Sequence, residues 1–469
     1  MSTNHSVNRP IKPVLAIIGW FLACVTAAIL PPAIQFGMVM RQTNAATKEE
    51  DRIYLLRRAA ALAPWSHHVS DELALVLRER PTKLVDQLET QAQLGWLSPT
   101  TQFAYAEALG KQGRSLRAEK TLQSLWDRRI LPEQSGLALA TLYHQQGRYA
   151  EEWSILEEQP PKKVARQRAI LLAGFGQWNA LKTLRQQITL SDIDTLFTPL
   201  SENDPFRREV AMGITLMQLG ESGLASFCFE RAVQFQPRIA DGWAWLAIAR
   251  YPTSISAAEQ AMSIAQTLPH SARGKSYLLL AGQYALMADQ MLVARASFEQ
   301  AYQQDHSSGS ALVGLGRSME EDDLAGAFLA YQKAAELDPF DPIPLEAIAY
   351  ACLQSGCPAN EVALPAIRNL ISLRPGSASD QILLARALAN QGDLAGSISA
   401  LQTAQLTENL SPEVASEILF YEGWIRFVYG QQNQAFLKFT QYSEQFPMGP
   451  HIQQVTQLLA QLEPPGQVK

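Results

Sequence analysis

The stretch that decides the fold is Phe206 to Pro237, FRREVAMGITLMQLGESGLASFCFERAVQFQP. Apolar residues recur at helical spacing on both sides of a short break marked by Gly220 and Gly223. Small residues stand where two packed helices would approach most closely: Gly213, Ala225 and Ala232. The stretch therefore predicts two short amphipathic helices joined by a tight turn, with Pro237 closing the unit.

The same skeleton recurs along most of the chain. Downstream it returns in the segments 240–272 and 275–308, and then continues to Pro447. Upstream it is clear from residue 99, degenerate over 162–188 and only loosely kept over 48–97. A helix pair that repeats in tandem cannot bury its apolar face alone, so each unit is expected to pack on its neighbours. The sequence therefore predicts an all-α repeat protein.

The repeat resembles the tetratricopeptide repeat (TPR) superfamily, whose unit is about 34 residues long. The segment 206–239 departs from the family pattern at Glu209, where a bulky residue is expected. It matches the pattern at Gly213, Gly220, Ala225, Phe229, Ala232 and Pro237. The resemblance covers roughly residues 99–447 well. It implies a right-handed superhelical solenoid of tandem helix-turn-helix repeats, with an inner groove lined by the first helix of each unit and holding a protein or peptide partner.

The repeats predict a division of the chain into an irregular half and a regular half. Residues 45–190 carry degenerate repeats, and residues 206–447 carry the regular array. The segment 191–205 between them lacks helical periodicity and is the predicted joint. Residues 448–469 are predicted to form a capping helix and a tail, because a terminal repeat needs a polar cover.

The N-terminal region predicts a membrane anchor. After a short tail, residues 1–12, no charge appears until Arg41, and residues 13–40 read as one transmembrane signal-anchor helix. A cleaved signal peptide ending near Ala27 is the alternative, but the apolar run continues beyond that point. Counted strictly, the positive-inside rule places the repeats in the cytoplasm. A short basic tail before the first apolar segment is also typical of a signal-anchor, and large domains translocate largely regardless of charge, so we expect a single-pass membrane protein with its repeats outside the cytoplasm.

Charge and cysteine content exclude some classes of protein. The net charge is -6, and the distal half, residues 201–469, carries 27 Asp and Glu against 16 Lys and Arg. This acidic half argues against nucleic acid as the partner. Four cysteines do not make a disulfide framework. Cys352 and Cys357 could pair if a helix ends at Gly356, but the preferred interpretation is that all four are buried small residues.

No motif for catalysis or cofactor binding is found. There is neither a Gly-rich phosphate loop nor a Gly-x-Ser-x-Gly elbow in the sequence. His67 and His68 are adjacent, so they do not share one helix face, and no cysteine pair lies beside a histidine to build a zinc site. We therefore expect no catalytic residues, no cofactor, no metal and no enzymatic activity.

The candidate partner-binding residues lie on the predicted first helices. Arg317 and Arg386 occupy equivalent positions in two repeats, and a guanidinium can grip a carboxylate with two parallel hydrogen bonds. An aromatic cluster follows at Phe420, Tyr421 and Trp424, residue types favoured as anchors in interfaces. The alternative is that the aromatic residues pack against the capping helix and the arginines face solvent.

Three functions are compatible with these observations. The first is a membrane-tethered scaffold for protein–protein interaction, for which the family resemblance implies a role in cell-envelope or surface-polysaccharide assembly. The second is an accessory subunit or an enzyme with a groove site for a sugar or peptide, which would need convergent polar groups in a pocket. The third is a self-associating structural array of helices.

Overall fold

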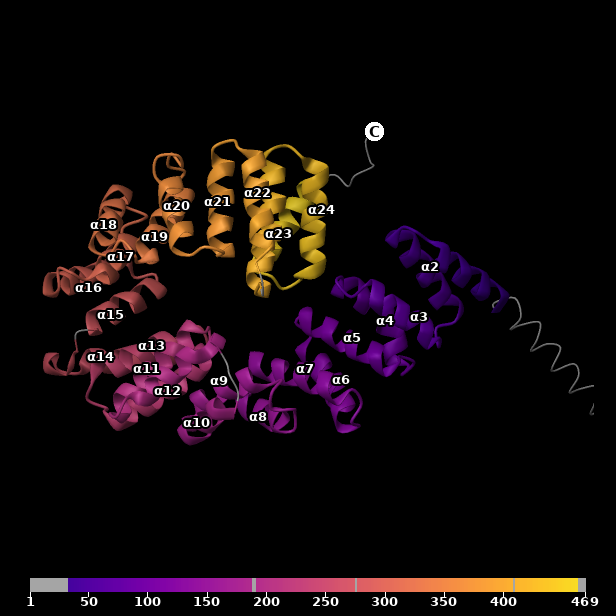
Figure 1. The fold of residues 1–469 in the computed structure, drawn as a ribbon, viewed down its shortest axis with the longest axis horizontal. Helices are drawn as coiled ribbons and strands as arrows, with labels where there is room; N and C mark the ends of the chain where they lie inside the picture. Colours follow the sequence, from indigo (N-terminus) through magenta and orange to yellow (C-terminus); the bar gives the residue numbers. More distant parts are fainter. Residues whose placement is uncertain (1–32, 188–190, 275, 408–409, 463–469) are drawn as a thin grey trace, which may run out of the picture. The chain divides into compact units, whose positions relative to one another are not determined.

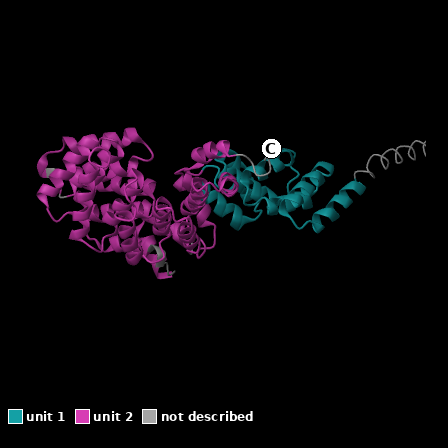
Figure 2. Ribbon diagram, turned by 90° about the horizontal axis from the view of Figure 1, so that it is seen from above, with its two compact units in different colours: residues 1–142, 444–448 teal, residues 143–443, 449–469 magenta. Residues whose placement is uncertain are grey.

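The computed structural model describes residues 33–187, 191–274, 276–407 and 410–462 (Figure 1). These residues are almost all helical or in turns between helices, and none of them forms a β-strand. Two compact units are present: residues 1–142 with 444–448 form unit 1, and residues 143–443 with 449–469 form unit 2 (Figure 2). The division therefore falls upstream of the segment 191–205, whose role as a joint stays a prediction.

Unit 1 contains consecutive helices that are joined by short turns. A helix over residues 33–45 comes first. It is followed by α2 (Glu49–Leu62), α3 (His67–Val76), α4 (Pro81–Gln93), α5 (Pro99–Lys111) and α6 (Ser115–Asp127), and α7 (Pro132–Gln145) crosses into unit 2. Helix α5 begins where Ser98 accepts a hydrogen bond from the backbone of Thr101 and Pro99 sets the first turn.

Unit 2 opens with less regular helices and continues as helix pairs. The first group is α8 (Tyr149–Glu157), α9 (Ala165–Phe175), α10 (Trp178–Gln187) and the 3-10 helix η1 (Ser191–Ser201). The pairs are α11 (Pro205–Gln218) with α12 (Ser222–Phe235), α13 (Ala240–Arg250) with α14 (Ile255–Thr267), and α15 (Tyr277–Met287) with α16 (Met291–Gln304), a short 3-10 helix η2 (His270–Ala272) preceding α15.

The pairs continue to the C-terminal end of the described chain. They are α17 (Gly309–Arg317) with α18 (Leu324–Leu337), α19 (Pro342–Ser355) with α20 (Ala363–Leu373), and α21 (Ala378–Asn390) with α22 (Leu394–Gln405). The last three helices are α23 (Pro412–Val428), α24 (Gln432–Gln445) and α25 (Ile452–Gln461). This succession confirms the predicted all-α helical repeat, while the right hand of the superhelix stays a prediction.

In several pairs the two helices approach closely because a glycine on the first faces an aromatic ring on the second. A methyl group on Gly213 would lie 2.6 Å from the ring of Phe229, and one on Gly423 would lie 2.7 Å from the ring of Phe439. Real side-chain carbons do not approach other atoms so closely. The small residues of the decisive stretch therefore have the role that the sequence predicts, which is to let the helices of a pair nest.

Neighbouring pairs share their apolar core. One cluster joins Leu312 on α17 and Tyr331 on α18 to Ile348 on the next pair. Tyr331 has no exposed surface. Its hydroxyl donates a hydrogen bond to Glu320, so the buried polar atom is satisfied. Each pair thus covers apolar surface that the previous pair leaves open.

Glu209, the residue that departs from the family pattern, is explained by an ion pair. The side chain is 2% exposed and lies 2.9 Å from Nη2 of Arg231, whose Nε also donates to it at 3.2 Å. Arg231 additionally donates to the backbone oxygen of Gly174 at 2.8 Å. Burial raises the pKa of Glu209, and Arg231 opposes that effect. The pair therefore ties α11 and α12 to the end of α9.

The cysteine prediction is wrong for two of the four residues. Helix α19 ends at Ser355, Gly356 adopts a left-handed conformation with φ of 71°, and Cys352 and Cys357 form a disulfide with their Cα atoms 5.1 Å apart. The turn at Gly356 brings the two sulfurs together, as the alternative interpretation required. Cys228 is a buried free thiol whose pKa is raised to about 12 by burial. Cys24 lies outside the described residues.

The predicted localisation as a single-pass membrane protein is contradicted. Over the ranges that the structure describes, no helix is both long and apolar enough to cross a membrane. Most of the predicted span, residues 13–32, lies outside those ranges. The helix over residues 33–45 is shorter than the roughly 20 apolar residues that a span needs.

Arg231 offers a test of the contact between α9 and the first regular pair. Replacement by Met leaves the Glu209 carboxylate buried without its ion partner, which is expected to cost about 3 kcal/mol of unfolding free energy. The double variant Glu209→Leu with Arg231→Met removes both charges and should recover most of that loss. Urea denaturation followed by circular dichroism measures both values. Equal stability of the single and double variants would contradict a coupled pair.

The disulfide predicts a redox-dependent stability. By the chain-entropy estimate, closing a loop of about six residues is worth about 2 kcal/mol. Reduction should therefore lower the urea midpoint of the wild type, and the double variant Cys352→Ala with Cys357→Ala should have the lower midpoint with or without reductant. Titration of thiols under denaturing conditions should rise by two on reduction. An unchanged thiol count would show that the bond is absent.

Candidate functional site

The first helices of the repeats in unit 2 form one continuous layer. The first helix of each pair contacts the first helix of the next pair. The helices in contact are α11 with α13, α13 with α15, α15 with α17, α17 with α19, α19 with α21, and α21 with α23. No comparable contact joins successive second helices in the described part of unit 2. The first helices are therefore closer together than the second helices, and we call their common surface the first-helix layer.

The structure separates the two arginines that the sequence treats as equivalent. Arg317 is the last residue of α17, and its side chain is exposed. Arg386 lies inside α21 and is half-buried. Its guanidinium carbon lies 4.8 Å from the ring centroid of Tyr421 and 5.8 Å from that of Tyr350. Only Arg386 is therefore placed among aromatic rings, which favour a cation above their faces.

Arg386 keeps its hydrogen-bond donors. In residues 33–187, 191–274, 276–407 and 410–462, no hydrogen bond or ion pair to Arg386 is found. Its guanidinium lies near the two tyrosine rings, and Glu417 is close enough to act on the pKa values of both tyrosines. A guanidinium presents five N–H donors in its own plane. Arg386 therefore contacts the two tyrosine rings, while its N–H donors remain available to a ligand.

The aromatic cluster divides into two parts. Tyr421 and Trp424 are half-buried on α23, with ring centroids 6.5 Å apart. Phe420 is 6% exposed and stacks on His451 with centroids 3.9 Å apart, close to Phe439. Phe420 therefore packs under the chain that leads into α25, as the alternative interpretation proposed for the aromatic residues. Tyr421 lies beside Arg386 and also has its ring centroid 6.0 Å from that of His451, and Trp424 lies next to Tyr421.

Tyr350 is the residue of this site that the sequence analysis did not single out. It lies on α19 and is 37% exposed. The repeat pattern places it among the core positions of its unit. The signal that could have found it is its place on the first helix before Arg386, since successive first helices are in contact.

Both tyrosines of the site stay neutral. Burial is the largest cause that raises the pKa of Tyr421, and the nearby carboxylate of Glu417 raises it further against the opposing effect of Arg386. Burial likewise raises the pKa of Tyr350, and Glu346 and Glu417 add to it. The two hydroxyls are therefore hydrogen-bond donors over the whole physiological range of pH.

Two other polar clusters are closed and have a structural role. In unit 2, His144 lies 2.8 Å from Glu152 and 2.8 Å from Glu221, and these bonds raise its pKa to about 10, the bond to Glu152 being the larger cause.

Over the described ranges, no group of three or more His, Cys, Asp and Glu side chains is placed to hold a metal ion.

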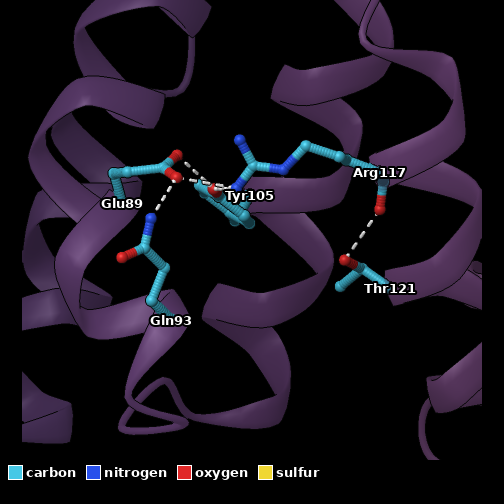
Figure 3. A network of polar contacts seen from close by, with 5 residues as sticks. All are labelled: Glu89, Gln93, Tyr105, Arg117 and Thr121. Atoms are coloured by element: carbon cyan, nitrogen blue, oxygen red, sulfur yellow. Dashed lines mark hydrogen bonds and ion pairs between the residues drawn. The ribbon is translucent and has the colours of Figure 1, made fainter.

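The second closed cluster links three consecutive helices of unit 1 (Figure 3). Glu89 on α4 accepts a hydrogen bond from the hydroxyl of Tyr105 on α5 and another from Arg117 on α6, both at 2.7 Å. Gln93 donates to the same carboxylate at 2.8 Å. Arg117 is the largest cause that lowers the pKa of Glu89 to about 2, and burial is the largest that raises the pKa of Tyr105 to about 12. The carboxylate is fully occupied, so the cluster fixes α4, α5 and α6 together.

Comparison with known proteins finds that this chain is similar to solved helical-repeat structures. No protein-family model matches the chain, and no curated protein is similar to it. The APC/C hetero-tetramer Cut9–Hcn1 is 14% identical, with 94% of this chain and 91% of that chain covered and a TM-score of 0.43. A tetratricopeptide repeat protein from Parabacteroides merdae is 13% identical, with 55% and 98% covered and a TM-score of 0.41.

Yeast Tom70 is 15% identical, with 93% of this chain and 88% of that chain covered and a TM-score of 0.41. All these values are low, so the assignment as a helical repeat rests on the helix pairs of the chain itself. The resemblance to the TPR superfamily likewise rests on the repeated residues, such as Gly213 and Phe229.

The cluster in Figure 3 predicts a pH dependence for unit 1. The folded-state pKa of Glu89 is about 2, below its ordinary value of 4.5, so its carboxylate stabilises the folded state fully above about pH 4.5. That contribution is lost as the pH falls through 4.5 toward 2. Hydrogen exchange of the α4–α6 amides, corrected for the intrinsic rate, should therefore increase between pH 5 and pH 3.

The Glu89→Gln variant should show less protection at pH 5 and a smaller change on acidification, because the group that titrates is absent. Asp86→Asn is the matched control, since Asp86 is an exposed carboxylate on the same helix. The same acid response in the Glu89→Gln variant and in the wild type would contradict the assignment.

Proposed function

We propose that this chain is a helical-repeat scaffold that binds a protein partner on the first-helix layer of unit 2. The observation that carries the proposal is the group formed by Arg386, Tyr350, Tyr421 and Trp424. It comes from three successive first helices and combines an arginine without a partner among the described residues with partly exposed aromatic rings. Arginine, tyrosine and tryptophan are the residues that dominate binding energy at protein interfaces.

The geometry supports a partner that lies across the repeats. The three helices α19, α21 and α23 contact one another in order, so their side chains form one surface. A segment of a partner that follows this surface would meet Tyr350, Arg386 and Tyr421 in succession. Arg317 lies farther along the layer on α17 and extends the proposed surface, whereas the buried ring of Phe420 supports it from below.

The envelope and polysaccharide role implied by the family resemblance is not part of the proposal. No contact, charge or cavity among the described residues favours it. The proposal is confined to binding of a protein on the first-helix layer.

Site-specific photo-crosslinking tests this proposal. A benzoylphenylalanine placed at Arg317 or Trp424 should give the same adduct of a partner protein in cells that express the chain. The probe placed at Leu329 or Leu437, which are 66% and 59% exposed on second helices, should give none. The comparison between the two surfaces is the measurement, because an exposed position alone can label neighbours at random.

Two outcomes would overturn the proposal. Labelling of equal strength from first and second helices would show that the first-helix layer is not the binding surface. Adducts with the mass of two copies of the chain would show that the array associates with itself.

A further inference from the structure

We propose that Arg386 recognises the carboxylate of an Asp or Glu side chain within an extended segment of the partner, next to an apolar residue that packs on Trp424. This inference rests on the proposed function, because it names the chemistry that the first-helix layer would bind. It assigns one anionic position and one apolar position to the ligand. The structure carries it through the position of the guanidinium, the hydroxyls of the two tyrosines near it and the charges around it.

The position of the guanidinium is restricted by the two rings. Tyr421 and Tyr350, on the helices that follow and precede α21, both lie within 6 Å of the guanidinium carbon, at 4.8 Å and 5.8 Å. An arginine held between rings loses less freedom when it binds, because its position is already restricted. The in-plane N–H donors match the two oxygens of a carboxylate.

The two tyrosines near Arg386 carry hydroxyls that are further potential donors. In the described part of the chain, neither Tyr350 nor Tyr421 makes a hydrogen bond through its hydroxyl with another residue. Both remain protonated because burial raises their pKa values. A carboxylate that reaches Arg386 can therefore accept from a neighbouring hydroxyl as well as from the guanidinium.

The surrounding charges favour a single negative charge. Arg374 is already committed to the buried carboxylate of Asp380 at 2.6 Å and lies 3.6 Å from Glu346. Glu417 acts on the pKa values of both tyrosines of the site, so it lies within electrostatic reach of the ligand position. One available guanidinium beside a carboxylate suits a carboxylate ligand better than a doubly charged phosphate.

The apolar requirement follows from α23. Trp424 stands edge-on to Tyr421 at 85° and is half-buried, so part of its ring is free for contact. The first-helix layer continues on both sides of α21, from α19 to α23, and a chain can pass Arg386 in either direction. An internal acidic residue therefore fits this surface, and the ligand does not have to end there.

A randomised peptide library displayed on phage and selected against the full chain tests the inference. Enriched peptides should share one acidic position next to an apolar position. Synthetic fluorescent copies, measured by fluorescence anisotropy, should bind at least about 10-fold more weakly when the acidic residue is replaced by its amide. This comparison leaves the protein unchanged, so a folding defect cannot produce it.

Protein variants locate the contact. Arg386→Gln should weaken binding of the acidic peptide at least about 10-fold and should have little effect on the amide peptide. Arg386→Lys should recover only part of the loss, since a lysine keeps the charge without the planar donors. Arg368→Gln is the matched control, because Arg368 is an exposed arginine on the second helix α20, and it should change binding by less than about 2-fold. Circular dichroism checks that each variant is folded.

The remaining outcomes distinguish a failure of the inference alone from a failure of the proposed function. Tighter binding of a phosphoserine peptide than of the acidic one would overturn the carboxylate assignment, and so would loss of binding on amidation of the peptide C-terminus. Peptides that need Trp424 but share no acidic position would overturn the inference and leave the proposed function standing. Failure to select any peptide whose binding is weakened by Arg386→Gln or Trp424→Ala would overturn both.

Discussion

The structure depends on close approach between the two helices of each repeat. In several repeats a glycine on the first helix faces an aromatic ring on the second, as Gly213 faces Phe229 and Gly423 faces Phe439. The ring fills the space that a side chain on the first helix would otherwise occupy, and the pair becomes a thin layer with two apolar faces. Such a layer cannot be stable in water by itself, so stability comes from stacking layers. Close-packed layers also bring successive first helices into contact, which creates the surface that we propose for binding.

Much of this architecture could be predicted from the sequence because it depends on local patterns. The spacing of apolar and small residues in 206–237 specifies helix lengths and the turn at Gly220, and repetition specifies stacking. The departure at Glu209 could not be interpreted, because its ion partner Arg231 follows 22 residues later on another helix. The sequence left the Cys352–Cys357 disulfide undecided for a similar reason, because the bond requires the helix to end at Gly356. The predicted localisation as a single-pass membrane protein was wrong, because no helix in the described part of the chain is both long and apolar enough to cross a membrane.

The candidate site was predicted only in part. The repeat register placed Arg317 and Arg386 at equivalent positions, but register says nothing of the neighbouring repeats. Arg386 differs because Tyr350 lies before it and Tyr421 after it, and these contacts between repeats are visible only in three dimensions. The different places of the aromatic residues were not visible for the same reason: Phe420 is stacked on His451, whereas Tyr421 lies near both His451 and Arg386. Most of the other charged groups discussed, including Glu89 with Arg117 and His144 with its two glutamates, bind one another and are closed to ligands.

Arg386 lies near one ring from the preceding repeat and one from the following repeat, and this has a mechanical consequence. The distance between Tyr350 and Tyr421 depends on the angle between neighbouring repeats, so the arginine is gripped only over a narrow range of local curvature. A ligand that requires the gripped arginine therefore binds one curvature more tightly than others. By thermodynamic reciprocity, the same ligand must stiffen this part of the array, and any force that bends the array must change the affinity for the ligand. At this point of the chain, the affinity for the ligand and the stiffness of the array are therefore coupled.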